Sequence, residues 1–246
     1  MKFNTATFTL FFLFGLNLNA TETNLIHLQY GKWQIWYNCE NRGYQVFNYT
    51  TVPDGGNLNR YSKFHQESTL PLECQQFSTS SYKSPKDSII KYDRGHGVHQ
   101  NIWDHSRELM IKSNSMANIV PQASKLNRHG VWRFTEVLTE CFRDLGKVEV
   151  WGGVVWGNDQ SNDLFVKSHG VVTPDYLWKL IIFPQGEVNA WLIPNDNSPI
   201  SKNIDNYLVA PSFLEKKTGV HFTIPDNEKF EADKIGLTKP QGCSIK

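Results

Sequence analysis

The sequence has no long hydrophobic run, no CxxC pair and no marked excess of charge of either sign. Its longest apolar stretch, residues 9–16, is too short to span a bilayer comfortably, and no other segment is a candidate transmembrane helix. The lack of CxxC pairs argues against a structural zinc cluster. A formal net charge of +1 argues against a generic polycation that coats nucleic acid, although a local basic groove remains compatible with it.

The first twenty residues have the pattern of a secretory signal. Lys2 supplies the positive start, residues 9–16 form the apolar stretch, and Ala20 is a small residue at a cleavage site. We therefore predict a signal peptide over residues 1–20, one mature domain over residues 21–246, and a secreted or periplasmic location. The remaining length suits a single domain, and neither internal repeats nor a low-complexity linker divide it.

Cysteine usage fits an exported protein. The four cysteines are Cys39, Cys74, Cys141 and Cys243. An even number in an exported chain favours two disulfides, although sequence order alone leaves all three pairings open. We favour Cys39 with Cys74, and Cys141 with Cys243.

Apolar residues alternate in several segments, as in half-buried strands. Predicted strands cover residues 25–37, 44–50, 148–156, 177–183 and 188–193. Gly152 and Gly153 indicate a β-bulge in the third of these. Helical spacing predicts helices over residues 131–142 and 212–217, the second capped by Ser212 and ended by Gly219. The expected fold class is α+β, with a mostly antiparallel central sheet flanked by helices.

Two polar clusters carry the candidate chemistry. Residues 92–100, YDRGHGVHQ, place an acid, a guanidinium and two imidazoles within nine positions. Residues 113–136 place carboxamides and an acid among apolar anchors; these are Asn118, Gln122, Asn127 and Glu136. Taken singly, each has an ordinary explanation, because a lone histidine is more often packed or exposed and either asparagine could cap a helix. Their order along the chain is more specific.

The ordered elements are Asp93-Arg-Gly-His96, Met116-Ala-Asn-Ile-Val-Pro-Gln122, Leu126-Asn127, Trp132 and Glu136. This pattern resembles the DNA/RNA non-specific endonucleases of the ββα-metal (His-Me finger) superfamily, most strongly over residues 92–140. The resemblance implies a ββα-metal catalytic motif and hydrolysis of phosphodiester bonds in DNA and RNA. No base-reading motif is present, which fits recognition through phosphates.

The resemblance also implies a division of labour. His96 is the general base, since an imidazole with an ordinary pKa near about 6.5 is mostly neutral at physiological pH. Asn127 is the direct protein ligand of Mg²⁺, with Mn²⁺ or another divalent cation as alternatives. Supporting roles fall to Glu136 (metal-bound water), Asp93 (outside the metal ligands), Asn118 (orienting His96 or the phosphate), and Arg60 and Arg94 (phosphate contacts).

One departure from the family pattern concerns the acid. The segment from Asn127 to Trp132 carries an extra residue, which on an ideal helix would rotate Glu136 by about 100° relative to Asn127. A bulge could absorb the residue, Asn127 could precede the regular helix, or Glu136 could differ from the family's acid.

Parts of the sequence are compatible with two other functions. A secreted, aromatic-rich binding module would need exposed tryptophan and tyrosine, whereas most tryptophans lie in apolar patterns typical of core. A zinc phosphoesterase using His96 and His99 would need a third ligand and a helix, and Gly95 and Gly97 disfavour that helix. No membrane partner is expected.

Overall fold

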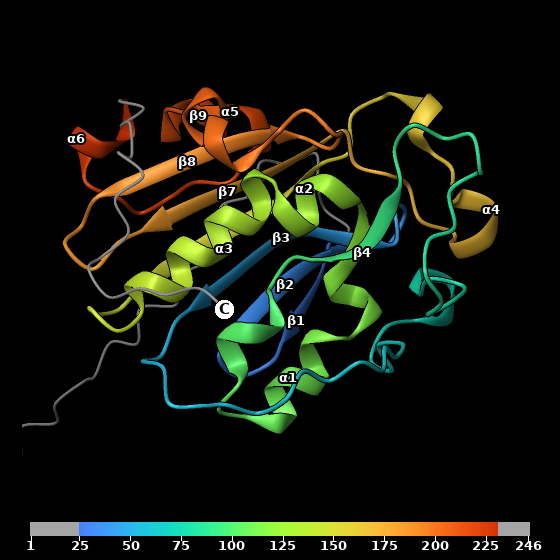
Figure 1. Cartoon of the computed structure of the whole chain (residues 1–246), viewed down its shortest axis with the longest axis horizontal. Helices are drawn as coiled ribbons and strands as arrows, with labels where there is room; N and C mark the ends of the chain where they lie inside the picture. The colour runs from blue at the N-terminus through green and yellow to red at the C-terminus, as the bar shows by residue number, and fades with distance from the viewer. Residues whose placement is uncertain (1–24, 231–246) are drawn as a thin grey trace, which may run out of the picture.

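A central seven-stranded antiparallel sheet confirms the α+β class in the computed structural model, which describes residues 25–230 (Figure 1). The strand order is β1 (Leu25–Gln29), β2 (Trp33–Asn38), β3 (Gly43–Thr50), β6 (Glu149–Val155), β7 (Tyr176–Ile182), β8 (Val188–Pro194) and β9 (Leu208–Val209). The predicted signal peptide and Cys243 lie outside the described residues. Within residues 25–230, no helix is long and apolar enough to cross a membrane.

Within residues 25–230, a separate two-stranded ribbon and six α-helices accompany the sheet. The ribbon pairs β4 (Tyr92–His96) with β5 (Ile119–Ala123). The helices are α1 (Arg107–Ser113), α2 (Ser124–His129), α3 (Val131–Phe142), α4 (Val166–His169), α5 (Pro211–Thr218) and α6 (Asp226–Lys229). Figure 1 shows α3 between β7 and the β4 segment, with α5 beside β8. The ribbon, α2 and α3 supply the predicted ββα arrangement.

The sheet buries apolar side chains on both faces. In β2, Trp33, Ile35 and Tyr37 are buried and alternate with less buried residues, because successive strand side chains point to opposite faces. One face packs against Trp132 and Leu138 of α3. The opposite face packs against α5 and the segment after it, through Leu214, Val220 and Phe222. The position of α3 on the sheet is therefore fixed by core packing.

The structure corrects the predicted bulge in β6. This strand keeps a continuous register with both β3 and β7. The two glycines instead make room for rings: a Cβ at Gly152 would lie 2.1 Å from Phe47, and one at Gly153 would lie 2.8 Å from Trp178. The register shift lies in β2, between Trp36 and Tyr37.

Two other local predictions also change. The segment 25–37 forms two strands, since the chain turns at Gly31 with a φ of 81°. Helix α5 begins at Pro211 after Ala210, so Ser212 is not its cap. The predicted end of this helix is confirmed, because Gly219 adopts the left-handed conformation with a φ of 74°.

The helix predicted over residues 131–142 is confirmed as α3. It is separated from α2 by Gly130, which has an extended backbone. Here the Val131 N–H donates to the Pro199 carbonyl at 3.1 Å, and a Cβ on Gly130 would lie 2.4 Å from the same oxygen. This contact breaks the helix, so Asn127 lies on α2, ahead of the regular helix. The extra residue is thereby accommodated.

One predicted disulfide is formed. Cys39, after β2, bonds to Cys74 in a 3₁₀ turn at Leu72–Cys74. The Tyr37 hydroxyl donates to the Cys74 carbonyl at 2.7 Å and reinforces the same connection. The pairing of Cys141 with Cys243 remains a prediction, because Cys243 lies outside the described residues.

Candidate active site

A cleft of about 410 Å³ opens between the end of β4 and the α2–α3 segment. Its lining residues are Arg60, His96, His99, Gln100, Asn101, Asn127, Arg128, His129, Arg133 and Glu136. Four predicted site residues, Arg60, His96, Asn127 and Glu136, therefore share one cavity although they come from four different segments. Asp93 lies next to this cleft, whereas Arg94 and Asn118 do not line it.

His96 is the last residue of β4 and is only 6% exposed. Its ring Nε2 lies 2.9 Å from Asn114 Oδ1. The Asn114 Nδ2 group donates to the carbonyls of Tyr61 and Lys63 at 2.9 and 3.1 Å. Since those carbonyls only accept, the amide oxygen must face the imidazole, and Nε2 must carry the proton. In neutral His96 the lone pair is therefore on Nδ1.

Burial lowers the pKa of His96 to about 3, since the charged imidazolium would lose its hydration. The hydrogen bond to Asn114 opposes this shift, whereas the positive charges of Arg60 and Arg94 add to it. The imidazole is thus neutral at physiological pH, as a proton acceptor must be.

The depressed pKa predicts a specific loss of stability in acid. The ordinary histidine pKa is about 6.5, whereas that of folded His96 is about 3. Between these two pH values, His96 is protonated in the unfolded chain and neutral in the folded protein. The free energy of unfolding should therefore decrease as pH falls through this window. In His96→Asn this contribution is absent, so urea unfolding at pH 7 and pH 4 should show a smaller difference than in wild type. Equal differences in the two proteins would contradict the prediction.

Asp93 organises the residues of α2 that face the cleft. Its carboxylate accepts hydrogen bonds from Ser124 Oγ at 3.0 Å, from Asn127 Nδ2 at 3.1 Å, and from Arg128 Nε and Nη2 at 2.7 and 2.6 Å. Burial alone would raise the pKa of Asp93, but these bonds hold it below its ordinary value. The carboxylate is therefore ionised and can only accept.

An accepting carboxylate decides which end of the Asn127 amide faces the cleft. The nitrogen must turn to Asp93, so the carboxamide oxygen is the atom left over. This Oδ1 accepts no hydrogen bond from any residue in the range 25–230. A neutral carboxamide oxygen is a hard donor that suits Mg²⁺ or Mn²⁺.

Glu136 faces the same cleft from α3 and is 7% exposed. Its Oε2 accepts from Arg133 Nη1 at 3.1 Å, and its Oε1 has no partner within the described chain. The acid thus remains in the site despite the inserted residue, because the break at Gly130 reorients α3. Together the two oxygen donors, Asn127 Oδ1 and Glu136 Oε1, fit a hard divalent cation.

Arg60 enters the cleft on a segment without regular secondary structure. The segment is tied down by an ion pair between Asp54 and Arg143 at 2.6 Å and by the Leu58 N–H, which donates to the Asp104 carbonyl at 3.1 Å. Arg107 Nη1 donates to the Asn59 carbonyl at 3.0 Å, one residue before Arg60. These contacts fix the backbone while leaving the Arg60 side chain exposed.

Arg94 occupies a different environment from the one expected for a phosphate ligand. Its guanidinium lies 3.7 Å from the Phe64 ring centroid, and Nη1 donates to the Thr79 carbonyl at 2.6 Å. The Phe64 ring also lies against the His96 ring, with 5.6 Å between centroids. In this structure Arg94 supports the strand that carries His96.

The predicted contact between Asn118 and His96 is replaced by the one from Asn114. Asn118 is fully buried, and its Oδ1 accepts from the Val98 N–H at 2.9 Å. Its Nδ2 donates to the carbonyls of Val98 and Ser113, both at 2.8 Å. These bonds engage both ends of the carboxamide, so Asn118 fixes the backbone two residues after His96 instead of touching the ring.

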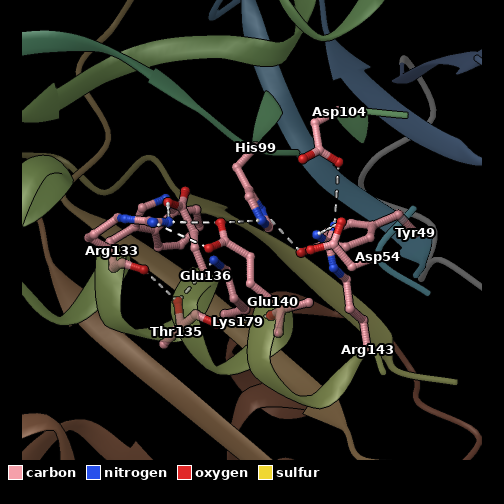
Figure 2. A network of polar contacts seen from close by, with 12 residues as sticks. Tyr49, Asp54, His99, Asp104, Arg133, Thr135, Glu136, Glu140, Arg143 and Lys179 are labelled. Carbon is pink, nitrogen blue, oxygen red and sulfur yellow. Dashed lines mark hydrogen bonds and ion pairs between the residues drawn. The ribbon is translucent and has the colours of Figure 1, made fainter. Parts of the chain in front are cut away.

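A polar network on α3 was not predicted (Figure 2). Arg133 Nη1 donates to Glu136 and, at 3.0 Å, to Glu140. Glu140 Oε1 also lies 3.4 Å from His99 Nε2, and the Tyr49 hydroxyl lies 3.4 Å from His99 Nδ1. Helical spacing of 133, 136 and 140 places these three side chains on one face, a signal that was available in the sequence.

The two histidines of the zinc alternative thus have separate polar partners, Asn114 for His96, and Glu140 with Tyr49 for His99. Among residues 25–230, no group of three His, Cys, Asp or Glu side chains is placed to hold a metal ion. The zinc alternative gains no support from this arrangement.

Next to this network, α3 packs against a buried lysine of the sheet. Lys179 of β7 is fully buried, donates to Thr135 Oγ1 at 2.9 Å and lies 3.7 Å above the Trp132 ring (Figure 2). Burial lowers the pKa of Lys179 to about 8, and the field of Glu136 opposes the shift. The lysine therefore anchors α3 to the sheet by polar as well as apolar contacts.

Comparison with known proteins identifies the family. A profile of DNA/RNA non-specific endonucleases matches residues 17–228. The chain belongs to the DNA/RNA non-specific endonuclease family. It is accordingly a hydrolase that acts on nucleic acids, in a family that uses divalent cations.

A solved structure shares the fold of this endonuclease. It is a chain from the crystal structure of the EndoG/EndoGI complex, which addresses the mechanism of EndoG inhibition. The TM-score is 0.63 at 16% sequence identity, over 82% of this chain and 88% of that chain. At this identity the similarity establishes the fold alone. A comparison with curated proteins found no significant match.

Proposed function

We propose that this endonuclease is exported and hydrolyses phosphodiester bonds of both DNA and RNA with a bound Mg²⁺, or with Mn²⁺ or another divalent cation in its place. The observation that carries the proposal is that His96 and Asn127 line one cleft. His96 offers an unprotonated ring nitrogen, and Asn127 offers an amide oxygen that accepts no hydrogen bond from the described chain.

The roles of the protein groups follow from these atoms. His96 Nδ1 would take a proton from the attacking water, while Nε2–H stays fixed on Asn114. The water oxygen bonds to phosphorus as the bond to the leaving oxygen breaks. Asn127 would hold the cation directly and Glu136 would hold its bound waters; when bound, the cation supplies charge neutralisation at the phosphate. Asp93 keeps Asn127 in the required orientation.

Substrate binding through phosphates is supported by basic side chains in the cleft. Arg60, which precedes β4, and Arg128 of α2 both line the cleft and are exposed. Although the whole chain is nearly neutral, such local charge attracts any polynucleotide backbone. Phosphates are common to DNA and RNA, so this mode of binding predicts cleavage of both.

Two features support export and enzymatic function over the binding-module alternative. The disulfide between Cys39 and Cys74 is typical of oxidising compartments. Each of the eight tryptophans is buried or only partly buried, so their rings offer little flat exposed surface for a glycan.

The test is a cleavage assay on the mature protein, with supercoiled plasmid DNA and structured RNA, in Mg²⁺ and in EDTA. We expect both polymers to be cut in Mg²⁺, cutting to stop in EDTA, and activity to return when Mg²⁺ exceeds the chelator. Cleavage that persists in EDTA would contradict the metal requirement. Failure to cut either polymer with any divalent cation would overturn the proposed function.

A further inference from the structure

Arg133 lies in the catalytic cleft without having been singled out by any motif. It projects from α3 beside Glu136, and its side chain is 23% exposed. The carboxylates of Glu136 and Glu140 both bind it (Figure 2). These bonds help keep its pKa above the ordinary arginine value, against the effect of burial. The guanidinium charge is therefore permanent.

The hydrogen bonds of Arg133 leave one particular edge of the guanidinium unused. A guanidinium has five N–H donors. The two on Nη1 point to Glu136 Oε2 at 3.1 Å and Glu140 Oε1 at 3.0 Å, and one on Nη2 points to Glu140 Oε2 at 3.3 Å. The remaining donors are Nε–H and the second Nη2–H, and neither has a partner among residues 25–230.

These two donors are not an arbitrary pair. In a planar guanidinium, Nε–H and the outer Nη2–H are parallel and lie on one edge, a spacing that matches two oxygens of a phosphate. Glu140 binds the end of the guanidinium, through Nη1 and the inner Nη2–H. The acids thus fix the plane of the group and leave a two-pronged donor available to a ligand in the cleft.

Glu140 is itself held from behind. Burial would raise its pKa, but the contact with His99 and the hydrogen bonds of Arg133 lower the pKa of Glu140 to about 2. His99 is in turn fixed by the Tyr49 hydroxyl at 3.4 Å. An ionised carboxylate held in this way orients Arg133 without contacting the substrate. Glu140 is therefore a positioning residue.

We propose that Arg133 is a further catalytic residue, which donates its Nε and Nη2 edge to two oxygens of the substrate phosphate while Glu136 and Glu140 hold the other edge. The inference rests on the proposed nuclease function. It adds a phosphate ligand on α3 to the cleft that Arg60 also lines, and it gives Glu140 and His99 a purpose that neither base nor metal chemistry requires.

The experiment compares Arg133→Lys and Arg133→Ala with wild type on oligonucleotides containing a single phosphorothioate of defined configuration. We expect kcat/KM on the all-oxygen substrate to fall about 10- to 100-fold, the loss of one or two charge-assisted hydrogen bonds. Sulfur accepts such bonds poorly, so in Arg133→Ala the oxygen-to-sulfur rate ratio should shrink for at least one diastereomer. Lys147→Ala removes an exposed, ion-paired cation that does not line the cleft and serves as control.

Glu140→Gln separates positioning from contact. It keeps the shape of the side chain but weakens the hold on Arg133, so a smaller loss is expected, and the double variant with Arg133→Ala should be no slower than Arg133→Ala alone. Circular dichroism and thermal melts identify any variant that fails to fold, and Arg133→Lys, which keeps the charge, remains informative if Arg133→Ala unfolds.

The possible failures are distinguishable. A wild-type protein that cuts no nucleic acid overturns the proposed function itself. An active wild type with folded Arg133 variants of unchanged rate overturns only the inference. So do slower variants whose oxygen-to-sulfur ratios match wild type for both diastereomers, because that result assigns Arg133 a purely structural role.

Discussion

His96→Ala should lower the turnover of plasmid DNA and of RNA by about 100- to 10,000-fold, the range typical of general-base catalysis. The variant removes the ring nitrogen that the Asn114 contact leaves unprotonated in the cleft. The reason is chemical, since the attacking water would lose its proton acceptor while the cation ligands stay in place. Initial rates at saturating Mg²⁺ measure the effect on both polymers.

His221→Ala provides the matched control, because its side chain is 58% exposed and lies outside the cleft. It should cut at the wild-type rate. A folded His96→Ala protein that retains wild-type activity would rule out His96 as the base. A circular dichroism spectrum unlike that of wild type would instead direct the test to His96→Asn, which fills the same space without a basic nitrogen.

Asn127→Ala should reduce activity by about 1,000-fold at a Mg²⁺ concentration that is just saturating for wild type. A catalytic cation contributes several kcal/mol to transition-state stabilisation, and about 4 kcal/mol corresponds to this factor. The variant removes the amide oxygen that faces the cleft. The Mg²⁺ concentration for half-maximal rate should rise, and isothermal titration with Mn²⁺ should show weaker binding.

Ser124→Ala distinguishes metal binding from support of Asp93. Like Asn127→Ala it deletes one hydrogen bond to the Asp93 carboxylate, but it leaves the Asn127 oxygen in place. We expect it to change the Mg²⁺ requirement little. If both variants raise that requirement equally, the effect originates in Asp93. If Asn127→Ala lowers only thermal stability, its role is structural.

Much of the fold was predictable from short-range patterns. The period of two in β2 and the helical spacing over residues 131–142 indicate which side chains are buried. These repeats follow from the geometry of a single strand or helix, so they can be read from neighbouring residues. The false bulge at Gly152 arose because the sequence does not reveal the ring of Phe47, which arrives from a different strand. The break at Gly130 similarly depends on Pro199, which is far away along the chain.

The residues of the candidate site that belong to the sequence motif were predictable. His96 and Asn127 were expected together, and they line one cleft. The choice between Asn114 and Asn118 as the partner of His96 was not accessible, because both amides lie in one polar cluster and tertiary packing decides which reaches the ring. The orientation of Arg133 likewise depends on how α3 lies on the sheet, which core packing determines.

Asp93 has a consequence that reaches beyond its own charge. An amide side chain is nearly symmetric in shape, and only its polarity distinguishes the two ends; the accepting carboxylate at 93 removes that ambiguity for Asn127. Asp93→Asn would keep the volume of the side chain, but its amide could pair with either the nitrogen or the oxygen of the Asn127 carboxamide. If Asn127 binds the cation as proposed, part of the population would then present a donor where the cation needs an acceptor, and Asp93, without touching the ion, would set the fraction of molecules able to bind it.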